Sequence, residues 1–155
     1  YLANSGVSIY AIAALCLLWL SDVSGYRLIM APFGASCVIL FALPESPLAQ
    51  PKNVVGGHVL TASVGLLALH FLPQSIWVTA LAVGVGIAVM VVSKTTHPPA
   101  GANPLLILLS GKTFAWSFLL FPVAIGAILL VLVAIIFHST VTRSKYPAVS
   151  FFGSK

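Results

Sequence analysis

The chain alternates six apolar runs with short polar segments. The runs cover residues 6–20, 28–43, 54–72, 76–93, 98–109 and 114–137. A helix needs about 20 apolar residues to cross a bilayer; four of the runs approach that length, and 28–43 and 98–109 are shorter. The pattern predicts an all-α integral membrane protein with six membrane elements in a single domain, 1–138, followed by a basic C-terminal tail, 139–155.

The two short runs begin with the same pattern of residues. Residues 32–36 read PFGAS and residues 99–103 read PAGAN, at a constant offset of 67. One apolar run precedes each copy and another follows it, so the chain divides into two units of three elements, 1–72 and 74–138. Three crossings per unit turn the second unit upside down, which is the inverted repeat of many transporters. The alternative is a chance recurrence of small residues in a chain rich in Gly, Ala and Pro.

Proline and glycine in these motifs interrupt a helix inside the expected membrane. Proline lacks an N–H and pushes the preceding residue out of the α region, so we expect residues 95–99 to be extended, reaching roughly the bilayer midplane at about 3.3 Å per residue. Helix starts there would present free N–H groups and partial positive charge to a small anion. The alternative is that Pro and Gly only allow close helix packing. The candidate binding residues are Gly34, Ala35, Ser36, Gly101, Ala102 and Asn103.

Composition strengthens the membrane assignment. Hydrophobic residues make up 60% of the chain and charged residues 6%, with a mean hydropathy of +1.13. No basic cluster with interleaved aromatic residues suggests nucleic-acid binding. With six crossings, the positive-inside rule predicts both termini in the cytoplasm, because the side of the N-terminus holds most of the basic residues: Lys52, Lys94, Arg143, Lys145 and Lys155, against Arg27 and Lys112 on the other side.

Among the ionisable residues, His97 is the sharpest candidate, since it lies within the expected break. It would donate a hydrogen bond to an anion or gate the path by protonation; alternatively, its ring holds the unwound backbone by bonding a carbonyl. His58 would line an entrance or cap a loop, and Lys52 and Lys94 would attract anions or simply snorkel to the surface. No carboxylate lies in an apolar run. Because metal-ligand spacings and catalytic motifs are also missing from the sequence, we expect no enzyme activity, metal or cofactor.

Three blocks of this sequence resemble the HPP family of integral membrane proteins, named for the tripeptide at 97–99. The blocks are FGAS at 33–36, SPLAQPKNVVGGH at 46–58 and THPPAGA at 96–102. The chain departs from the family at Lys52, where Arg is frequent and where Lys loses the bidentate fork, and at Asn103, where Thr or a small residue is commoner. The family is commonly described with four spans, whereas the apolar pattern here predicts six elements.

The resemblance implies membrane transport, because plant members are associated with nitrite movement across the chloroplast envelope. Together with the expected anion site, it predicts transport of a small inorganic anion, with nitrite first, through a homo-oligomer in a lipid bilayer. The expected location is a bacterial inner membrane, with a chloroplast envelope as the alternative. Two other functions stay open: a membrane scaffold or binding subunit that transports nothing, and a proton-coupled carrier of another small anion.

Overall fold

The computed structural model describes residues 11, 14–15, 17–19, 22 and 30–148, and these residues form helices and no strand. The helices are α2 (Ala31–Ala42), α3 (Pro51–Phe71), α4 (Ile76–Val92), α5 (Asn103–Leu109) and α6 (Ile125–Phe137). The 3-10 helices η1 (Pro47–Ala49) and η2 (Pro98–Ala102) precede α3 and α5, and the π-helical turns η3 (Leu119–Ala124) and η4 (His138–Thr142) flank α6. Most of the element expected at 6–20 lies outside the described residues.

The helices are apolar and expose many large apolar side chains. Two helical stretches, Pro51–Phe71 and Leu119–Thr142, are long and apolar enough to cross a membrane, and three shorter apolar stretches accompany them: Ala31–Ala42, Ile76–Val92 and Pro98–Leu109. Large apolar side chains point outward from these helices, with Phe71, Trp77 and Val92 between 73% and 84% exposed. Transfer of side chains of this kind from water into hydrocarbon is favourable.

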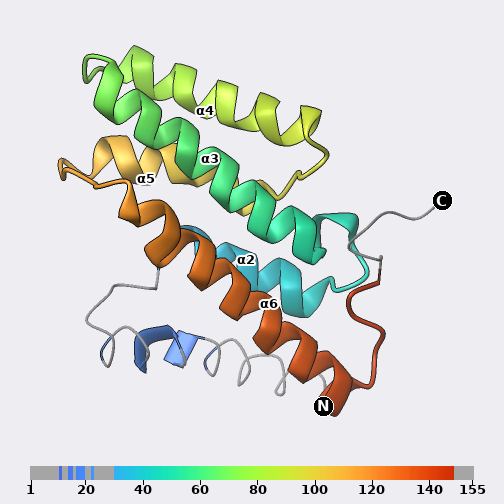
Figure 1. Cartoon of the computed structure of the whole chain (residues 1–155). Helices are drawn as coiled ribbons and strands as arrows, with labels where there is room; N and C mark the ends of the chain where they lie inside the picture. The colour runs from blue at the N-terminus through green and yellow to red at the C-terminus, as the bar shows by residue number, and fades with distance from the viewer. Residues whose placement is uncertain (1–10, 12–13, 16, 20–21, 23–29, 149–155) are drawn as a thin grey trace.

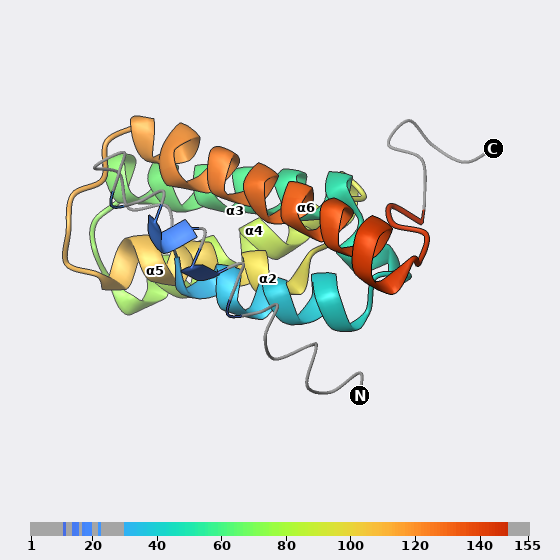
Figure 2. The ribbon, with the colours of Figure 1, turned by 90° about the horizontal axis from the view of Figure 1, so that it is seen from below.

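Successive helices run in alternating directions. In Figures 1 and 2, α2, α4 and α6 run one way along the bundle, and α3 and α5 run the other way. The connections 43–50 and 93–97 and the segment after η4 therefore lie at one end, together with Lys52, Lys94, Arg143 and Lys145. The connections 72–75 and 110–118, which include Lys112, lie at the other end.

The two motif helices start at equivalent positions. The residue before each helix is extended, with φ −127° and ψ 148° at Met30 and φ −137° and ψ 99° at His97. Helix α2 then begins at Ala31 and η2 at Pro98, which is the same offset of 67. Both starts come earlier than expected from the motifs, because proline needs no N–H partner in the first helical turn and its φ already suits a helix. The extended stretch before η2 accordingly ends at His97.

Two other boundaries differ from the sequence-based expectation. Helix α3 begins at Pro51, again with proline in the first turn, and so includes Lys52 and Asn53, which were expected in a loop. The last span, expected at 114–137, covers Leu119–Thr142 instead, and it is kinked at Phe121, whose φ of −122° and ψ of 114° are not helical. Pro122 explains the kink, since it disfavours the α region at the residue before it.

Close packing of α5 on α3 depends on Gly65. A Cβ atom at this position would lie 2.9 Å from Cδ1 of Ile107 and 3.1 Å from Cα of Pro104. Because a backbone atom stands on the other side of the contact, the two helices meet at a distance that only glycine permits.

The segment after α6 is tied to the connection between α2 and α3. The Tyr146 hydroxyl donates a hydrogen bond to the Ala49 carbonyl at 2.8 Å, and the Ala148 amide donates to Oε1 of Gln50 at 2.9 Å. His138, the first residue of η4, is buried, and its Nε2 lies 2.9 Å from the Leu40 carbonyl. These bonds join the C-terminal end of the last helix to the first half of the chain.

Replacing Tyr146 with phenylalanine should lower the free energy of unfolding by about 1 kcal/mol, because one hydrogen bond is lost and the Ala49 carbonyl is left without that donor. Burial raises the pKa of the Tyr146 hydroxyl. The unfolded chain then loses this proton near its ordinary pKa of about 10 while the folded chain keeps it, so stability falls as pH rises above that value. Thermal unfolding in detergent should show this alkaline loss in the unsubstituted protein, and a smaller one in Tyr146→Phe. An identical alkaline loss in both proteins would contradict the assignment.

Candidate functional site: a buried histidine cluster between the two motifs

Two histidines and a serine from three separate segments meet in the interior. Oγ of Ser36 on α2 lies 2.9 Å from Nε2 of His58 on α3 and 2.8 Å from Nε2 of His97, the residue before η2. All three side chains are fully buried, at 0% exposure. A buried polar group without a partner is costly, so the three side chains stabilise one another in an otherwise apolar bundle.

Asn103 reaches the same cluster from the second motif. Its Nδ2 lies 3.1 Å from Nδ1 of His58, 3.1 Å from the His58 carbonyl and 2.9 Å from Oγ1 of Thr61. Ser36 and Asn103 are the fifth residues of the two copies of the motif, and they contact the two ring nitrogens of one histidine. The repeated pattern in the sequence therefore corresponds to a shared contact in space.

The partners assign the hydrogens in the cluster. Nδ1 of His97 lies 2.8 Å from the Leu48 carbonyl, which only accepts, so Nδ1 carries the hydrogen and Nε2 of a neutral ring accepts. Ser36 then donates to His97 and accepts from Nε2–H of His58, and Nδ1 of His58 accepts from Asn103. The bonds form one chain with a single direction, from Asn103 through His58, Ser36 and His97 to Leu48.

Small residues on α3 bring His97 into this position. A Cβ atom at Gly57 would lie 3.0 Å from both the His97 Cβ and the Thr95 carbonyl oxygen. The neighbouring Asn53 donates to the Thr96 carbonyl at 2.9 Å. The extended segment 95–97 therefore lies directly on the first turns of α3. The Asn53 hydrogen bond holds it there, and the absence of a side chain at Gly57 permits the close approach.

The electrostatic surroundings of the cluster contain no carboxylate. The sequence has two acidic residues, Asp22 and Glu45, and both are exposed. The His58 ring packs edge-on against Phe33, with centroids 4.9 Å apart. Oδ1 of Asn103 is buried without a hydrogen-bond partner among the described residues. Within the same part of the chain, no group of three or more His, Cys, Asp or Glu side chains is placed to hold a metal ion.

The other candidate residues lie outside this cluster. Gly34 and Ala35 are on the exposed face of α2, and Gly101 and Ala102 are half-buried, with Ile87 the neighbour nearest to Gly101. Ser36 lies in the second turn of α2, so its side chain reaches the cluster and its backbone amide lies inside the helix. The motif predicted free backbone amides of a helix start at 34–36. The structure does not have them there, because α2 starts at Ala31.

Both candidate lysines are exposed at the end of the bundle nearest to His97. Lys52 lies in the first turn of α3. Lys94 follows α4 with a φ of 56°, in the left-handed region. Neither contacts the histidine cluster in the structure, so both are surface cations at that end of the bundle.

Two members of the site were not found from the sequence. The Leu48 carbonyl and the Thr61 hydroxyl both take part in the network. Leu48 lies in the SPLAQP stretch, where three residues of 3-10 helix turn a carbonyl toward His97. The sequence does contain a signal for ordered backbone in that stretch, because Pro47 and Pro51 restrict its conformation.

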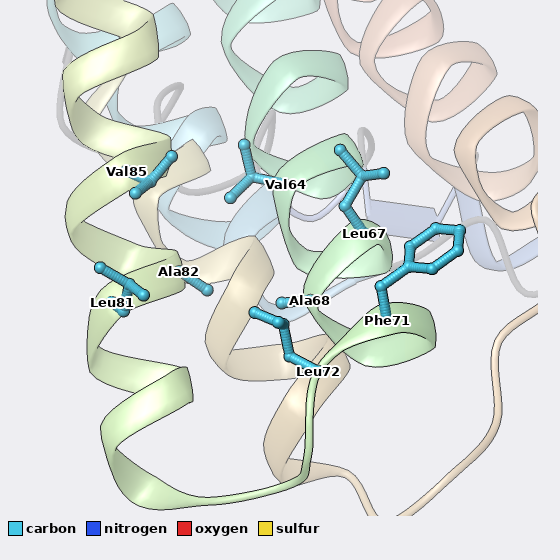
Figure 3. A pocket seen from close by; sticks show the side chains of 8 residues that line it. All are labelled: Val64, Leu67, Ala68, Phe71, Leu72, Leu81, Ala82 and Val85. Atoms are coloured by element: carbon cyan, nitrogen blue, oxygen red, sulfur yellow. The ribbon is translucent and has the colours of Figure 1, made fainter.

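A separate groove lies between α3 and α4. It has a volume of about 310 Å³ and is lined only by apolar side chains, among them Leu67, Phe71, Leu81 and Val85. Figure 3 shows the side chains that line it on α3 and α4, with Val64 of α3 and Ala82 and Val85 of α4 between the two helices. A groove of this composition suits the hydrocarbon of a bilayer and offers nothing to hold an anion.

A family model described as the HPP transmembrane region matches residues 2–147. The chain belongs to the HPP family. Two proteins of Dictyostelium discoideum, described as transmembrane proteins, are 36% identical over 126 residues and 35% identical over 128 residues. These matches cover 77% and 78% of this chain but 40% and 45% of the relatives, so the chain spans less than half of their length. No solved structure matches it.

In this HPP protein, the histidine and the prolines of the tripeptide have different roles. His97 supplies a side chain to the cluster, while Pro98 and Pro99 form the first turn of η2 directly after it. Pro98 keeps His97 extended, and this extended conformation places the ring between Leu48 and Ser36.

Proposed function

We propose that this HPP protein moves a small inorganic anion across a membrane, with nitrite as the first substrate to test. The observation that carries the proposal is the meeting of Ser36 and Asn103, one from each motif, on the two nitrogens of His58. Polar side chains inside a membrane protein are costly and commonly mark a substrate or ion path. The family resemblance adds nitrite as the substrate, since it associates plant members with nitrite movement.

An anion would bind by replacing bonds within the cluster. The hydrogen atoms at Ser36 Oγ, His58 Nε2 and Asn103 Nδ2 all point at neighbouring acceptors, and a small oxyanion accepts bonds from such donors. Because the cluster is fully buried, passage requires α2 to separate from η2, on which it packs. The exposed lysines at the near end of the bundle, Lys52 and Lys94, would draw anions to that mouth.

We also propose the inverted repeat as the architecture of transport. The opposite directions of α2 and α5 and the equal starting positions of α2 and η2 support it. The basic residues gathered at one end support a topology with both termini in the cytoplasm, in a bacterial inner membrane or a chloroplast envelope. A pore in so small a bundle would use more than one copy of the chain, so a homo-oligomer is part of the proposal.

The second candidate function is a membrane scaffold that transports nothing. The closed state of the cluster favours it, since nearly every polar atom already has a partner inside the protein. A scaffold needs the cluster only for stability, whereas a transporter needs it for flux. Flux measurements therefore separate the two functions.

Purified protein in liposomes should take up nitrite faster than protein-free liposomes, which are the necessary baseline because nitrous acid crosses bilayers unaided. Ser36→Ala should reduce this protein-dependent uptake by about tenfold or more, since a hydrogen bond to a charged group contributes about 1.5–3 kcal/mol. Ser63→Ala is the matched control, because among the described residues the Ser63 hydroxyl bonds only its own helix, at the Val59 carbonyl. Absence of protein-dependent uptake for nitrite, nitrate, formate and chloride would leave the scaffold as the function.

A further inference from the structure

The Ser36 hydroxyl has two acceptors within reach and one hydrogen to give. Its Oγ lies 2.8 Å from Nε2 of His97 and 3.1 Å from the Pro32 carbonyl oxygen, four residues earlier on α2. In the neutral cluster this hydrogen points at His97, because Nε2 there has a lone pair and no hydrogen. The Pro32 carbonyl is a second acceptor within hydrogen-bond distance of the same hydroxyl, and it competes with His97 for this hydrogen.

Adding one proton to Nε2 of His97 makes the Ser36 hydroxyl donate its hydrogen to the Pro32 carbonyl. The ring then donates from both nitrogens, to the Leu48 carbonyl and to Oγ of Ser36. The Ser36 hydroxyl turns about its Cβ–Oγ bond and donates to Pro32, while Oγ accepts from both histidines with its two lone pairs. The new N–H bond forms as a hydronium ion at the aqueous side gives up one O–H bond and leaves as water, and no covalent bond within the protein breaks. Every hydrogen in the cluster keeps an acceptor in both states.

The charge of that proton has no partner inside the protein. His58 is the titratable group in contact with His97, at a centroid distance of 5.2 Å. The elements around it also carry Cys37 on α2, Lys52 at the start of α3, Lys94 in the preceding turn and Glu45 before η1; Cys37 is buried, and the other three are exposed. Helices α4 and α5 carry no titratable side chain. A buried imidazolium without a counter-charge is strongly unfavourable.

We propose that His97 takes up one proton together with each anion that enters the cluster. This inference rests on the proposed anion transport and names its coupling. The anion supplies the missing counter-charge, and the proton supplies the charge that attracts the anion, so each raises the affinity for the other by the same factor. Rotation of the Ser36 hydroxyl keeps the cluster hydrogen-bonded in both the neutral and the protonated state of His97, without movement of a helix.

The test is nitrite uptake into proteoliposomes that contain a pH-sensitive dye, at mildly alkaline pH where little nitrous acid forms. After subtraction of the protein-free baseline, nitrite entry should acidify the lumen by about one proton per anion, as linkage of one proton to one anion requires. A potassium diffusion potential should leave the rate unchanged, since proton and anion together carry no net charge. Lowering the external pH should accelerate uptake.

His97→Asn should abolish lumen acidification, and any remaining nitrite flux should follow the imposed voltage. His70→Asn is the control, because His70 is exposed and bonds the Phe114 carbonyl away from the cluster. A folding defect in His97→Asn is recognised by size-exclusion chromatography. A second measurement then uses the unsubstituted protein alone: nitrogen-15 NMR of labelled histidines should show His97 Nε2 gaining its proton when nitrite is added at constant pH.

The outcomes separate the two proposals. Nitrite entry without acidification, at a rate that follows voltage, overturns the proton coupling and leaves anion transport standing. Acidification that persists in His97→Asn overturns the assignment to His97. No protein-dependent entry of any anion overturns the transport function, and the coupling with it.

Discussion

Changing Asn103 to aspartate should reduce protein-dependent nitrite flux by about a hundredfold and lower the free energy of unfolding by about 3 kcal/mol. The side chain is 1% exposed, so the substitution places a carboxylate of nearly the same shape inside the cluster. A buried charge at this position repels an entering anion, and at an effective dielectric constant of about 20 two charges about 4 Å apart interact by about 4 kcal/mol. The carboxylate also lacks the hydrogens that Nδ2 donates to Thr61 and to the His58 carbonyl.

The matched control for this charge is Gln74→Glu. It makes the same amide-to-carboxylate change on an exposed residue between α3 and α4, at the end of the bundle away from His97. We expect flux and thermal stability close to those of the unsubstituted protein. Flux should return in Asn103→Asp as pH falls, since the protonated carboxyl is neutral, and thermal unfolding measured at each pH separates this recovery from a recovery of folding. Equal flux in Asn103→Asp and Gln74→Glu at alkaline pH would exclude the cluster from the anion path.

Much of this arrangement follows from local rules. Proline and glycine in a membrane element indicate a helix start, and the repeated motif with its constant offset identified Ser36 and Asn103 as equivalent residues. Short polar connections identified where the helices end, and the alternation of runs predicted their alternating directions. Each of these conclusions depends on residues that are near one another in the chain, and this is why they could be reached without the fold.

The role of His58 could not be reached in the same way. It was expected to line an entrance or cap a loop, because it follows two glycines near the start of an apolar run. In the structure it is the centre of the cluster, and Gly57 instead makes room for segment 95–97. Helix α3 is apolar around most of its circumference, so its sequence has no polar face from which the orientation of His58 can be derived.

The same limit applies to the expected anion site. Free helix amides were predicted at Gly34 and Ala35 from the positions of the prolines, but the helix begins earlier and those residues face outward. The sequence could show that helices start in the membrane, whereas the side that carries the polar contacts depends on which helix packs against them. Side chains of Ser36, His58 and Asn103 replace the amides in the proposed site.

Gly57→Ala should destabilise the protein by about 1–3 kcal/mol, in the range of overpacked cores. The added Cβ atom would lie 3.0 Å from the His97 Cβ, 3.0 Å from the Thr95 carbonyl oxygen and 3.3 Å from Sδ of Met90. Of these, only the methionine sulfur lies toward the end of a flexible side chain. The substitution should therefore push segment 95–97 away from α3 and lengthen the bond between His97 and Ser36, so that nitrite flux falls together with stability.

Gly84→Ala is the control, because it makes the same change in the middle of α4, where a Cβ atom meets nothing within 4 Å. Alanine favours a helix over glycine by about 1 kcal/mol, so Gly84→Ala should raise the melting temperature while Gly57→Ala lowers it. If the same substitution raises the melting temperature at Gly84 and lowers it at Gly57, the loss at Gly57 comes from the contact with His97 and not from helix propensity. A Gly57→Ala protein that melts at or above the temperature of Gly84→Ala would show that the extended segment does not rest on α3, and the geometry that holds His97 against Ser36 would have to be abandoned.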